Sequence, residues 1–460
     1  MVFVAAFGLN DDLRDGVKES IEKLEAGKIT TRMISGDNMY TAIACALKAG
    51  ILRYGEENLP GRVMLGEDFF RQIDGIKLLR DKKGNEKWIP SDMGQFKKIA
   101  QTLIILARST PEHKFALIAG LKELGLNIAV TADGINDAKA LKHANVGFCM
   151  GISGCEVAKD ASDIIILDDN FNSVFRAVQW GRNILDNIRK FIQFQLSVNI
   201  VCIVITFLGG ATLGNPTFSV IQLLWINMIM DTLAAISLAT EPPHPSNLKQ
   251  DRQKKSDKII LPVMWRNIIG QVTYQLVVLI VMLYTVPWWF GKGYNLADNS
   301  KIDFFGAKAN ETPDVTIARI YKLEHYTMIF HTFVLMNLFN QINSRKLGWA
   351  DFNIFERFFN NFKFLLVVVA EFAFQYLIVL YGGAIFRTSP LAWDQHLTCF
   401  CFGFGSLLVG LGLKFLPIRE EGRFLYDFNE SGVHDENSIF NKVSQRISKR
   451  DEIKENLLPN

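Results

Sequence analysis

The 460-residue sequence has little net charge, few cysteines and no long apolar run in its first 190 residues. Fifty Lys and Arg against 47 Asp and Glu leave a net charge of +3, which gives no electrostatic support to a nucleic-acid-binding protein. The six cysteines form no Cys-X-X-Cys pair, so a reducing compartment is the simpler interpretation. A hydrophobic content of 49% excludes a disordered chain.

Long apolar windows begin only after residue 190, and each approaches the ~20 residues that a helix needs to cross a bilayer. We count six, at about 190–209, 220–239, 267–290, 325–343, 364–386 and 397–416. The sequence therefore predicts a transmembrane domain of six helices over residues 188–418, between an N-terminal domain at 1–187 and a tail at 419–460.

The loops between these windows predict their orientation. The connections 240–266 and 344–363 and the tail are rich in Lys and Arg, whereas 210–219 has neither and 387–396 has one. Because positively charged loops stay in the cytosol, we expect the N-terminal domain and the tail to be cytosolic. We expect an integral, multi-pass protein of the plasma membrane or an endomembrane, and no signal peptide is visible at Met1.

Residues 1–187 alternate short apolar runs with amphipathic stretches, which indicates an α/β domain with a parallel sheet covered on both faces. We expect strands at 2–7, 31–34, 103–107, 127–131, 146–150 and 164–167, and helices at 16–26, 39–49 and 112–124. Polar groups follow three of these strands, at 35–38, 108–114 and 131–137. In such sheets ligands bind beyond the carboxyl ends of the strands, so these groups are candidates for one site.

The residue types in these turns suit phosphoryl transfer. Asp133 and Asp137 flank a strand-to-helix turn that can aim both carboxylates at Mg²⁺, which prefers one or two carboxylates, water and phosphate oxygens. Ser35 lies in a glycine-containing turn that can bind a phosphate, and Lys114 supplies a compact positive charge. Such sites work mainly by positioning and charge neutralisation. The alternative is that Asp-Gly and Ser-Gly are ordinary turn residues.

These motifs resemble those of P-type ATPases, specifically the C-terminal half of a plasma-membrane-type calcium pump. Met33-Ile-Ser-Gly-Asp-Asn38 is similar to the family's MVTGDN motif, and Thr131-Ala-Asp-Gly-Ile-Asn-Asp137 is similar to TGDGTND. Gly8-Leu-Asn-Asp-Asp-Leu-Arg14 resembles the GIEDPVR segment. The most discriminating stretch is Trp225-Ile-Asn-Met-Ile-Met-Asp-Thr-Leu-Ala-Ala235, continued by Leu238-Ala-Thr-Glu-Pro-Pro243. The resemblance covers about residues 2–420.

The resemblance implies a dehalogenase-like (Rossmannoid) phosphorylation domain that lacks its first strand, followed by a bundle of six transmembrane helices. It also implies ATP and Mg²⁺ as cofactors and Ca²⁺ as the transported ion. The implied site residues are Lys114, Ser35, Gly36 and Asn136 around the phosphoryl group; Asp11, Arg14 and Asp37 on the nucleotide and hinge side; Asp133 and Asp137 for Mg²⁺; and Asn199, Asn227 and Asp231 for Ca²⁺.

The sequence also departs from this family. Pumps of the family are phosphorylated on the Asp of a DKTGT motif, and no Asp-Lys-Thr-Gly occurs in these 460 residues. The nucleotide domain, the actuator domain and the first four spans are also missing, so we expect the isolated chain to be inactive. Two alternatives remain, a catalytically inactive membrane scaffold or regulatory pseudoenzyme derived from the pump, and a dehalogenase-type phosphatase fused to an anchor.

The membrane half contains acids that are costly in hydrocarbon and therefore indicate an ion path or internal hydrogen bonds. Asn227 and Asp231 are four residues apart, so on an α-helix they would share a face. Their oxygens suit Ca²⁺, although asparagines can also bond neighbouring helices. We interpret Glu371 and Gln375, one turn apart, as a structural hydrogen-bonded pair.

The tail contains one further pattern, a basic amphipathic stretch around Ile439, Phe440, Val443 and Ile447. Basic amphipathic helices bind calmodulin or acidic lipid. A short solvated tail is the simpler alternative.

Overall fold

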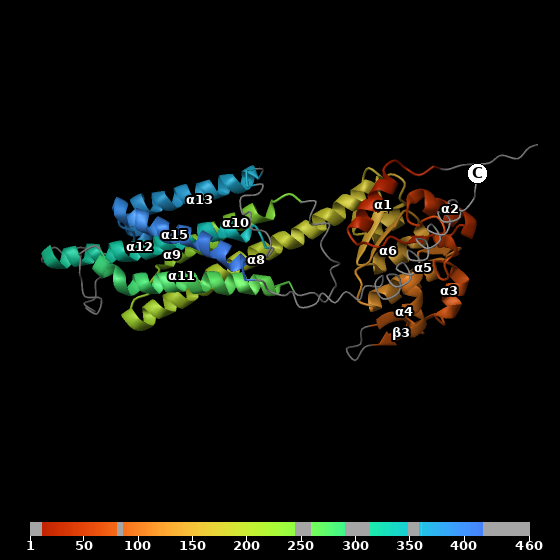
Figure 1. The fold of residues 1–460 in the computed structure, drawn as a ribbon, viewed down its shortest axis with the longest axis horizontal. Coiled ribbons are helices and arrows are strands. Elements are labelled where there is room, and N and C mark those ends of the chain that lie inside the picture. Colours follow the sequence, from red (N-terminus) through yellow and green to blue (C-terminus); the bar gives the residue numbers. More distant parts are fainter. Residues whose placement is uncertain are drawn as a thin grey trace, which may run out of the picture. The chain divides into compact units, whose positions relative to one another are not determined.

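The structure is a computed structural model that describes residues 12–80, 86–243, 259–289, 313–347, 358–359 and 361–416. It divides into two compact units (Figure 1), an α/β unit that runs to Gly181 and a helical unit that begins at Arg182. The N-terminal run at 2–7, Asp11 and the tail from 419 lie outside the described residues.

The α/β unit contains two parallel sheets of three strands each within its described part. In the first, β5 (Ile105–Ala107) lies between β1 (Met33–Ile34) and β2 (Val63–Leu65). In the second, β7 (Val146–Met150) lies between β6 (Ala129–Ala132) and β8 (Ile164–Ile166). The parallel α/β fold is confirmed, but these strands make two sheets where the sequence predicts one.

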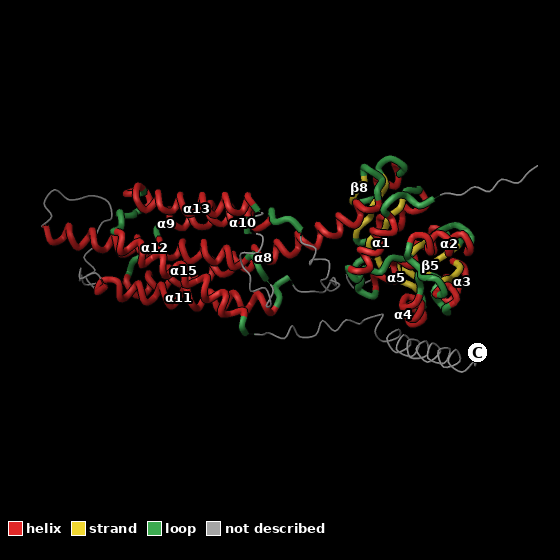
Figure 2. The backbone as a smooth tube through the Cα atoms, turned by 45° about the horizontal axis from the view of Figure 1, so that its top comes forward, coloured by secondary structure: helices red, strands yellow, loops and turns green. Residues whose placement is uncertain are grey.

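Seven α-helices are described in this unit (Figure 2): α1 (Val17–Ala26), α2 (Met39–Ala49), α3 (Gly66–Gln72), α4 (Met93–Thr102), α5 (Pro111–Glu123), α6 (Ala138–His143) and α7 (Glu156–Ala161). Between α3 and α4 lies an antiparallel hairpin, β3 (Ile76–Arg80) and β4 (Glu86–Pro90), in a stretch for which the sequence predicts no element.

Helix α5 packs against both sheets. Its Leu117 lies in one hydrophobic cluster with Leu106 of β5, and its Ile118 lies in another with Val130 of β6. The helix is almost fully buried because apolar residues occupy all its faces from Phe115 to Leu121. The start of α5 is therefore fixed relative to the ends of both sheets.

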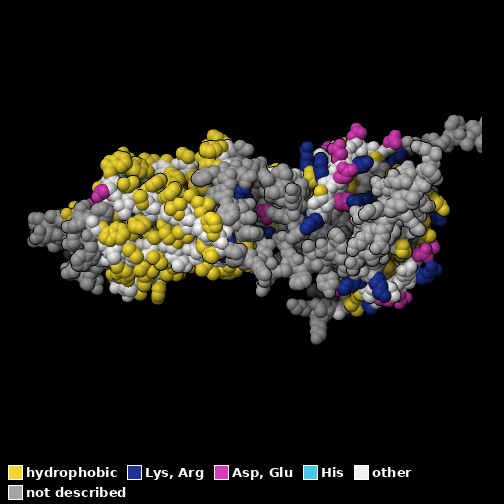
Figure 3. Space-filling model, viewed as in Figure 1, with side chains coloured by type: hydrophobic (Ala, Val, Ile, Leu, Met, Phe, Trp, Pro, Cys, Tyr) yellow, Lys and Arg dark blue, Asp and Glu magenta, His cyan; other side chains and the backbone are white. Residues whose placement is uncertain are grey.

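The helical unit consists of α8 (Phe171–Leu213), which begins in the α/β unit, and then α9 (Val220–Leu224), η3 (Trp225–Met230), α10 (Asp231–Ala239), α11 (Pro262–Trp289), α12 (Pro313–Ser344), α13 (Phe362–Tyr381), α14 (Gly383–Phe386) and α15 (Trp393–Lys414). Five helices of the described chain are long and apolar enough to cross a membrane, and they coincide with five of the six predicted windows. On the face drawn in Figure 3, hydrophobic side chains cover much of this unit.

Three of the predicted spans differ from the helices observed. The first helix begins at Phe171 rather than near residue 190, and the second is interrupted by the π-helical turn η3. In the window at 364–386, α13 ends at Tyr381 and the short α14 follows it as a separate helix, because Gly383 has a φ of 42° in the left-handed region.

The window at 325–343 lies in α12, which is not among the five apolar helices. Every residue from 325 to 345 is buried, including polar side chains such as His331, Asn337 and Gln341. A helix enclosed by other helices presents no apolar surface to lipid, so its composition is more polar than that of its neighbours.

Candidate functional site

The loops after β1 and β5 hold each other in the first sheet. The carbonyl oxygen of Ser35 accepts hydrogen bonds from both the backbone N–H and the Oγ of Ser109, each at 2.9 Å. The N–H of Arg108 donates to the carbonyl of Asp37 at 2.9 Å. Arg108 has a φ of 46°, which is uncommon for a residue with a side chain and often occurs at functional sites. Three backbone-directed contacts therefore fix the predicted phosphate turn.

Within that turn, Ser35 and Asp37 are paired. The Ser35 hydroxyl donates to Oδ2 of Asp37 at 2.8 Å and accepts from its N–H at 3.0 Å. Asn38 then caps α2, because its side chain accepts from the N–H of Thr41 at 2.9 Å. A Cβ at Gly36 would meet no atom of the described residues closer than 3.9 Å, so packing does not require the glycine.

Lys114 and Asp137 form the second pair. A capping box between Thr110 and His113, with Pro111 at the first turn, fixes the start of α5 and therefore the position of Lys114. Its Nζ lies 2.6 Å from Oδ1 of Asp137, and the two side chains are only 18% and 16% exposed. The structure thus brings together a predicted phosphate-binding lysine and a predicted Mg²⁺ ligand.

The other predicted residues of the turn after β6 are open to solvent. Asp133 and Asn136 are exposed, and Asp133 contributes its carbonyl to a bond from the N–H of Cys155 at 3.0 Å. Lys139 follows the turn, but its Nζ lies 4.4 Å from the centre of the Phe115 ring. In the described part of the unit, no hydrogen bond or ion pair joins the Lys114–Asp137 pair to Ser35.

Arg14 lies elsewhere in the unit, beside Asp169. Its Nη1 donates to the Asp169 carbonyl at 2.7 Å and is 3.6 Å from the carboxylate. The same carboxylate accepts the N–H groups of Ile152 and Ser153, at 3.0 and 2.8 Å. The bond from Ile152, with that from Ser153, lowers the pKa of Asp169 to about 2. The structure therefore does not bring Arg14 together with Asp37.

In the helical unit, Asp231 is the buried acid that the sequence selects. Only 3% of it is exposed, at the first residue of α10 directly after the π-helical turn. The Nε2 of Gln195 on α8 donates to Asp231 Oδ2 at 2.8 Å. The oxygens Asp231 Oδ1 and Gln195 Oε1 are buried and have no partner among the described residues. Gln195 was not predicted, although it lies one helical turn before Asn199.

The predicted common face of Asn227 and Asp231 is wrong, since Asn227 is exposed and Asp231 is buried. The physical reason is η3, because a π-helical turn rotates the residues it contains out of α-helical register. Asn199 is half-buried. Among the described residues, no group of three or more His, Cys, Asp or Glu side chains could hold a metal ion.

The predicted hydrogen bond between Glu371 and Gln375 is also wrong. The hydrogen-bonding neighbour of Glu371 is Gln341 on α12 rather than Gln375, and only 2% of Glu371 is exposed. Gln375 instead places its Nε2 3.5 Å from Nδ1 of His331 on α12.

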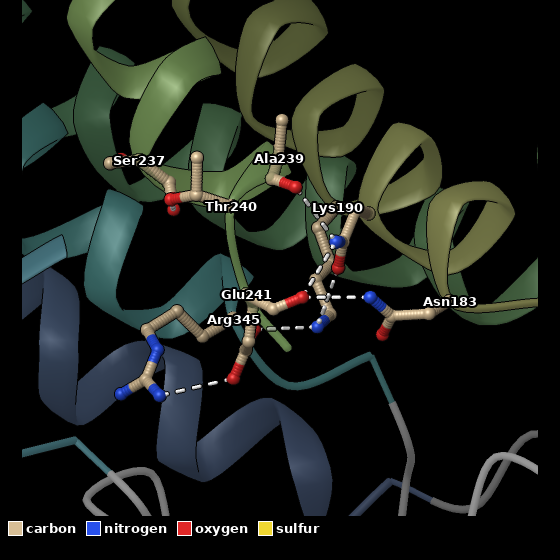
Figure 4. A network of polar contacts seen from close by, with 8 residues as sticks. Asn183, Lys190, Ser237, Ala239, Thr240, Glu241 and Arg345 are labelled. Atoms are coloured by element: carbon tan, nitrogen blue, oxygen red, sulfur yellow. Dashed lines mark hydrogen bonds and ion pairs between the residues drawn. The ribbon is translucent and has the colours of Figure 1, made fainter. Parts of the chain in front are cut away.

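A polar network that the sequence did not predict surrounds Glu241, in the loop after α10 (Figure 4). Its two carboxylate oxygens lie 2.7 Å from Nζ of Lys190 and 3.1 Å from Nη2 of Arg345. Its carbonyl accepts from Nδ2 of Asn183 at 2.7 Å. Burial alone would raise the pKa of Glu241, but the two cations outweigh it and hold that pKa below its usual range. The network joins this loop to α8 and α12.

The chain is similar to known proteins over most of its length. Residues 215–416 match the family described as "Cation transporting ATPase, C-terminus". The chain is 41% identical over 419 residues to plasma membrane calcium-transporting ATPase 1 of Mus musculus, a match that covers 90% of this chain and 32% of the relative. It is 39% identical over 422 residues to plasma membrane calcium-transporting ATPase 3 of Homo sapiens, covering 91% of this chain and 32% of the relative.

The chain spans about a third of the length of these relatives. Its apolar helices are those of an integral membrane protein. Its α/β unit contains the polar turns that follow β1, β5 and β6. Residues 215–416 thus match the C-terminal region of cation-transporting ATPases, and the chain as a whole matches the C-terminal portion of plasma membrane calcium-transporting ATPases.

Proposed function

We propose that this chain is the C-terminal portion of an ATP-driven pump that exports Ca²⁺ from the cytosol. The observation that carries the proposal is Asp231, a buried carboxylate in an apolar helix with one oxygen bonded to Gln195 and the other without a described partner. A carboxylate in such surroundings is costly unless a cation or a proton balances it. The relatives that match the chain are named for calcium transport.

The oxygen atoms near Asp231 suit Ca²⁺ as the transported substrate. Ca²⁺ takes six to eight oxygen ligands from carboxylates, amides, carbonyls and water. Asp231 supplies a carboxylate, Gln195 a buried amide oxygen without a described partner, and Asn199, one turn beyond Gln195, a further amide. Asn227 is exposed and would have to turn toward the ion to add its own amide oxygen.

The α/β unit would bind Mg²⁺ and a phosphoryl group. Asp133 is exposed and Asp137 is anchored by Lys114, so two carboxylates and a cation surround the turn after β6. This donor set fits Mg²⁺, which neutralises charge on phosphate oxygens when bound. Lys114 would balance the phosphoryl charge, and Ser35, Gly36 and Asn136 would contact the group. Asp37, Arg14 and Asp11 remain proposals for the nucleotide and hinge side.

A phosphate-accepting Asp would have to reach this site on another segment. In the described part of the unit, β1 pairs only with β5 and β6 pairs only with β7, and both strands are at least partly exposed. We propose that an added parallel strand pairs with these two edges and carries that Asp. The sequence has no Asp-Lys-Thr-Gly, which also keeps a catalytically inactive scaffold as the second candidate.

The test is calcium binding by the purified chain in lipid nanodiscs, measured with radioactive Ca²⁺. Asp231→Asn keeps the size of the side chain but removes its charge, so the affinity should fall by roughly a hundredfold, or about 3 kcal/mol. Asp394→Asn, an exposed acid on α15, is the matched control and should bind like the wild type. Equal Ca²⁺ affinities of Asp231→Asn and the wild type would show that Asp231 is not a calcium ligand.

A further inference from the structure

We infer that Glu371 is a proton-binding site, connected through Gln375, His331 and His396 to the end of the helical unit where α15 begins. This proton site does not require that the chain bind calcium. The hydrogen-bond geometry and the balance of donors and acceptors around Glu371 support it.

The four side chains form a continuous row on three packed helices, α13, α12 and α15. Glu371 and Gln375 lie one turn apart on α13 and are 2% and 0% exposed. Gln375 Nε2 is 3.5 Å from His331 Nδ1, and His331 Nε2 is 3.3 Å from His396 Nδ1. His331 is buried, whereas His396, in the first turn of α15, is only half-buried. The row therefore runs from the interior toward the surface.

The neighbourhood of Glu371 has more acceptors than donors. Gln341 on α12 hydrogen-bonds to Glu371 with one hydrogen of its amide nitrogen and donates the other to Oγ of Ser237 at 2.9 Å. The amide nitrogen of Gln375 points to His331. Four buried oxygens, Gln341 Oε1, Gln375 Oε1, Glu371 Oε1 and Glu371 Oε2, compete for the one remaining N–H of each amide, and none has a partner at close hydrogen-bond geometry in the described structure. A proton on Glu371 converts one of these acceptors into a donor and satisfies another.

The histidine pair fixes how that proton can leave. An amide nitrogen only donates, so His331 Nδ1 accepts from Gln375, and neutral His331 then carries its proton on Nε2 and donates it to Nδ1 of His396. His396 in turn carries its proton on Nε2, which has no partner among the described residues.

The opposite arrangement holds one proton fewer. The Gln375 amide turns over, so that its nitrogen faces an ionised Glu371 and its oxygen accepts from Nδ1 of His331. In the exchange His396 releases its Nε2 proton to water and takes the Nε2 proton of His331 onto Nδ1. The Gln375 amide then gives a proton from its nitrogen to Nδ1 of His331 and takes one on its oxygen from Glu371, so that each histidine still carries one proton, now on Nδ1. Between the two arrangements Glu371 loses one proton and water at His396 gains one, so the exchange is balanced.

Other charged or titratable groups near this row have their own partners or lie in solvent. Asp231 on α10 is within electrostatic reach of Glu371 but is bonded to Gln195. The ring of Tyr376 lies 5.3 Å from that of His396. Glu324 accepts a bond from Gln395 at 3.4 Å, and Asp394 is exposed. In the described structure none of these donates a hydrogen bond to Glu371.

The experiment is infrared spectroscopy of the chain in nanodiscs at neutral pH, with transfer from H₂O to D₂O. A carbonyl-stretch band of a protonated carboxylic acid should be present, vanish in Glu371→Gln and return at a shifted frequency in Glu371→Asp. Asp394→Asn should leave it unchanged. A wild-type spectrum without the band, or an unchanged band in Glu371→Gln, would show that Glu371 is not the proton-binding site.

The route is tested by the rate at which deuterium shifts that band. His396→Gln, at a half-buried position, and His331→Asn should slow the shift by at least about tenfold, because each removes a group that takes and returns the proton. His325→Gln is the matched control, since His325 lies on the same helix but contacts the carbonyl of Met282 at 2.9 Å, away from this row. Equal rates in all three variants would overturn the route.

Discussion

At the scale of single residues, Asp169 joins three parts of the chain. Its carboxylate accepts two backbone N–H groups from the loop after β7, and Arg14 binds beside it. Asp169 lies two residues before the start of α8 and has a φ of 49°, which Asp adopts more readily than most residues. The start of α8 is therefore fixed by the hydrogen bonds and the ion pair of Asp169 as well as by the hydrogen bonds of the helix itself.

The lowered pKa of Asp169 predicts a pH dependence of stability. A carboxyl with a pKa of about 2 when folded, against an ordinary value of 3.8, stabilises the fold above pH 3.8 and loses that contribution as the pH falls toward 2. Asp169→Asn should therefore lower the unfolding temperature at pH 7 and flatten its dependence on pH in this window. Thermal unfolding followed by circular dichroism measures both. Asp160→Asn, an exposed acid on α7, should change neither.

The two predicted Mg²⁺ ligands should respond differently to the loss of their charges. Asp133→Asn, at an exposed position, should change the free energy of unfolding by no more than about 0.5 kcal/mol. It should still weaken Mn²⁺ binding, measured by electron paramagnetic resonance as a substitute for Mg²⁺. Asp137→Asn should weaken Mn²⁺ binding and also stability, because Lys114 loses its partner. Unaltered Mn²⁺ binding in both variants would show that Asp133 and Asp137 do not bind the metal and that the turn has only a structural role.

At the scale of elements, local signals decide which boundaries the sequence predicts well. The bounds of α2 and β7 agree with those expected from the sequence. For α2 the reason is local, since Asn38 caps its start and Gly50, with a φ of 77°, ends it. The hairpin of β3 and β4 has no such signal, because its strands are stabilised by pairing with each other.

Helix packing in the helical unit depends on glycines whose hydrogens face a neighbour. A Cβ at Gly403 of α15 would lie 2.8 Å from the Leu335 side chain of α12. Gly403→Ala should therefore destabilise the unit by roughly 1–3 kcal/mol. Gly412→Ala on the same helix meets no atom within 4 Å and should be neutral or stabilising by up to about 1 kcal/mol. Thermal unfolding in detergent compares the two variants, and a reversed order would contradict the packing of α12 on α15.

At the scale of the whole molecule, the sequence predicts the α/β unit, the apolar helices and the buried acid Asp231. It does not predict which polar groups meet, because those contacts join helices far apart in the chain. Gln195 reaches Asp231 from α8, and His331 reaches Gln375 from α12. The exposure of Asn227 also could not be predicted, since the π-helical turn has no recognised signal in the sequence.

We propose that this chain supplies the calcium-carrying part of a pump. The most direct measurement replaces the matched third of the mouse plasma membrane calcium-transporting ATPase 1 with this chain and follows ATP-dependent Ca²⁺ uptake into vesicles. The account predicts uptake by the chimera and none by the same chimera with Asp231→Asn, at equal amounts in the membrane. Absence of uptake by the chimera, or equal uptake with and without the Asp231 carboxylate, would contradict it.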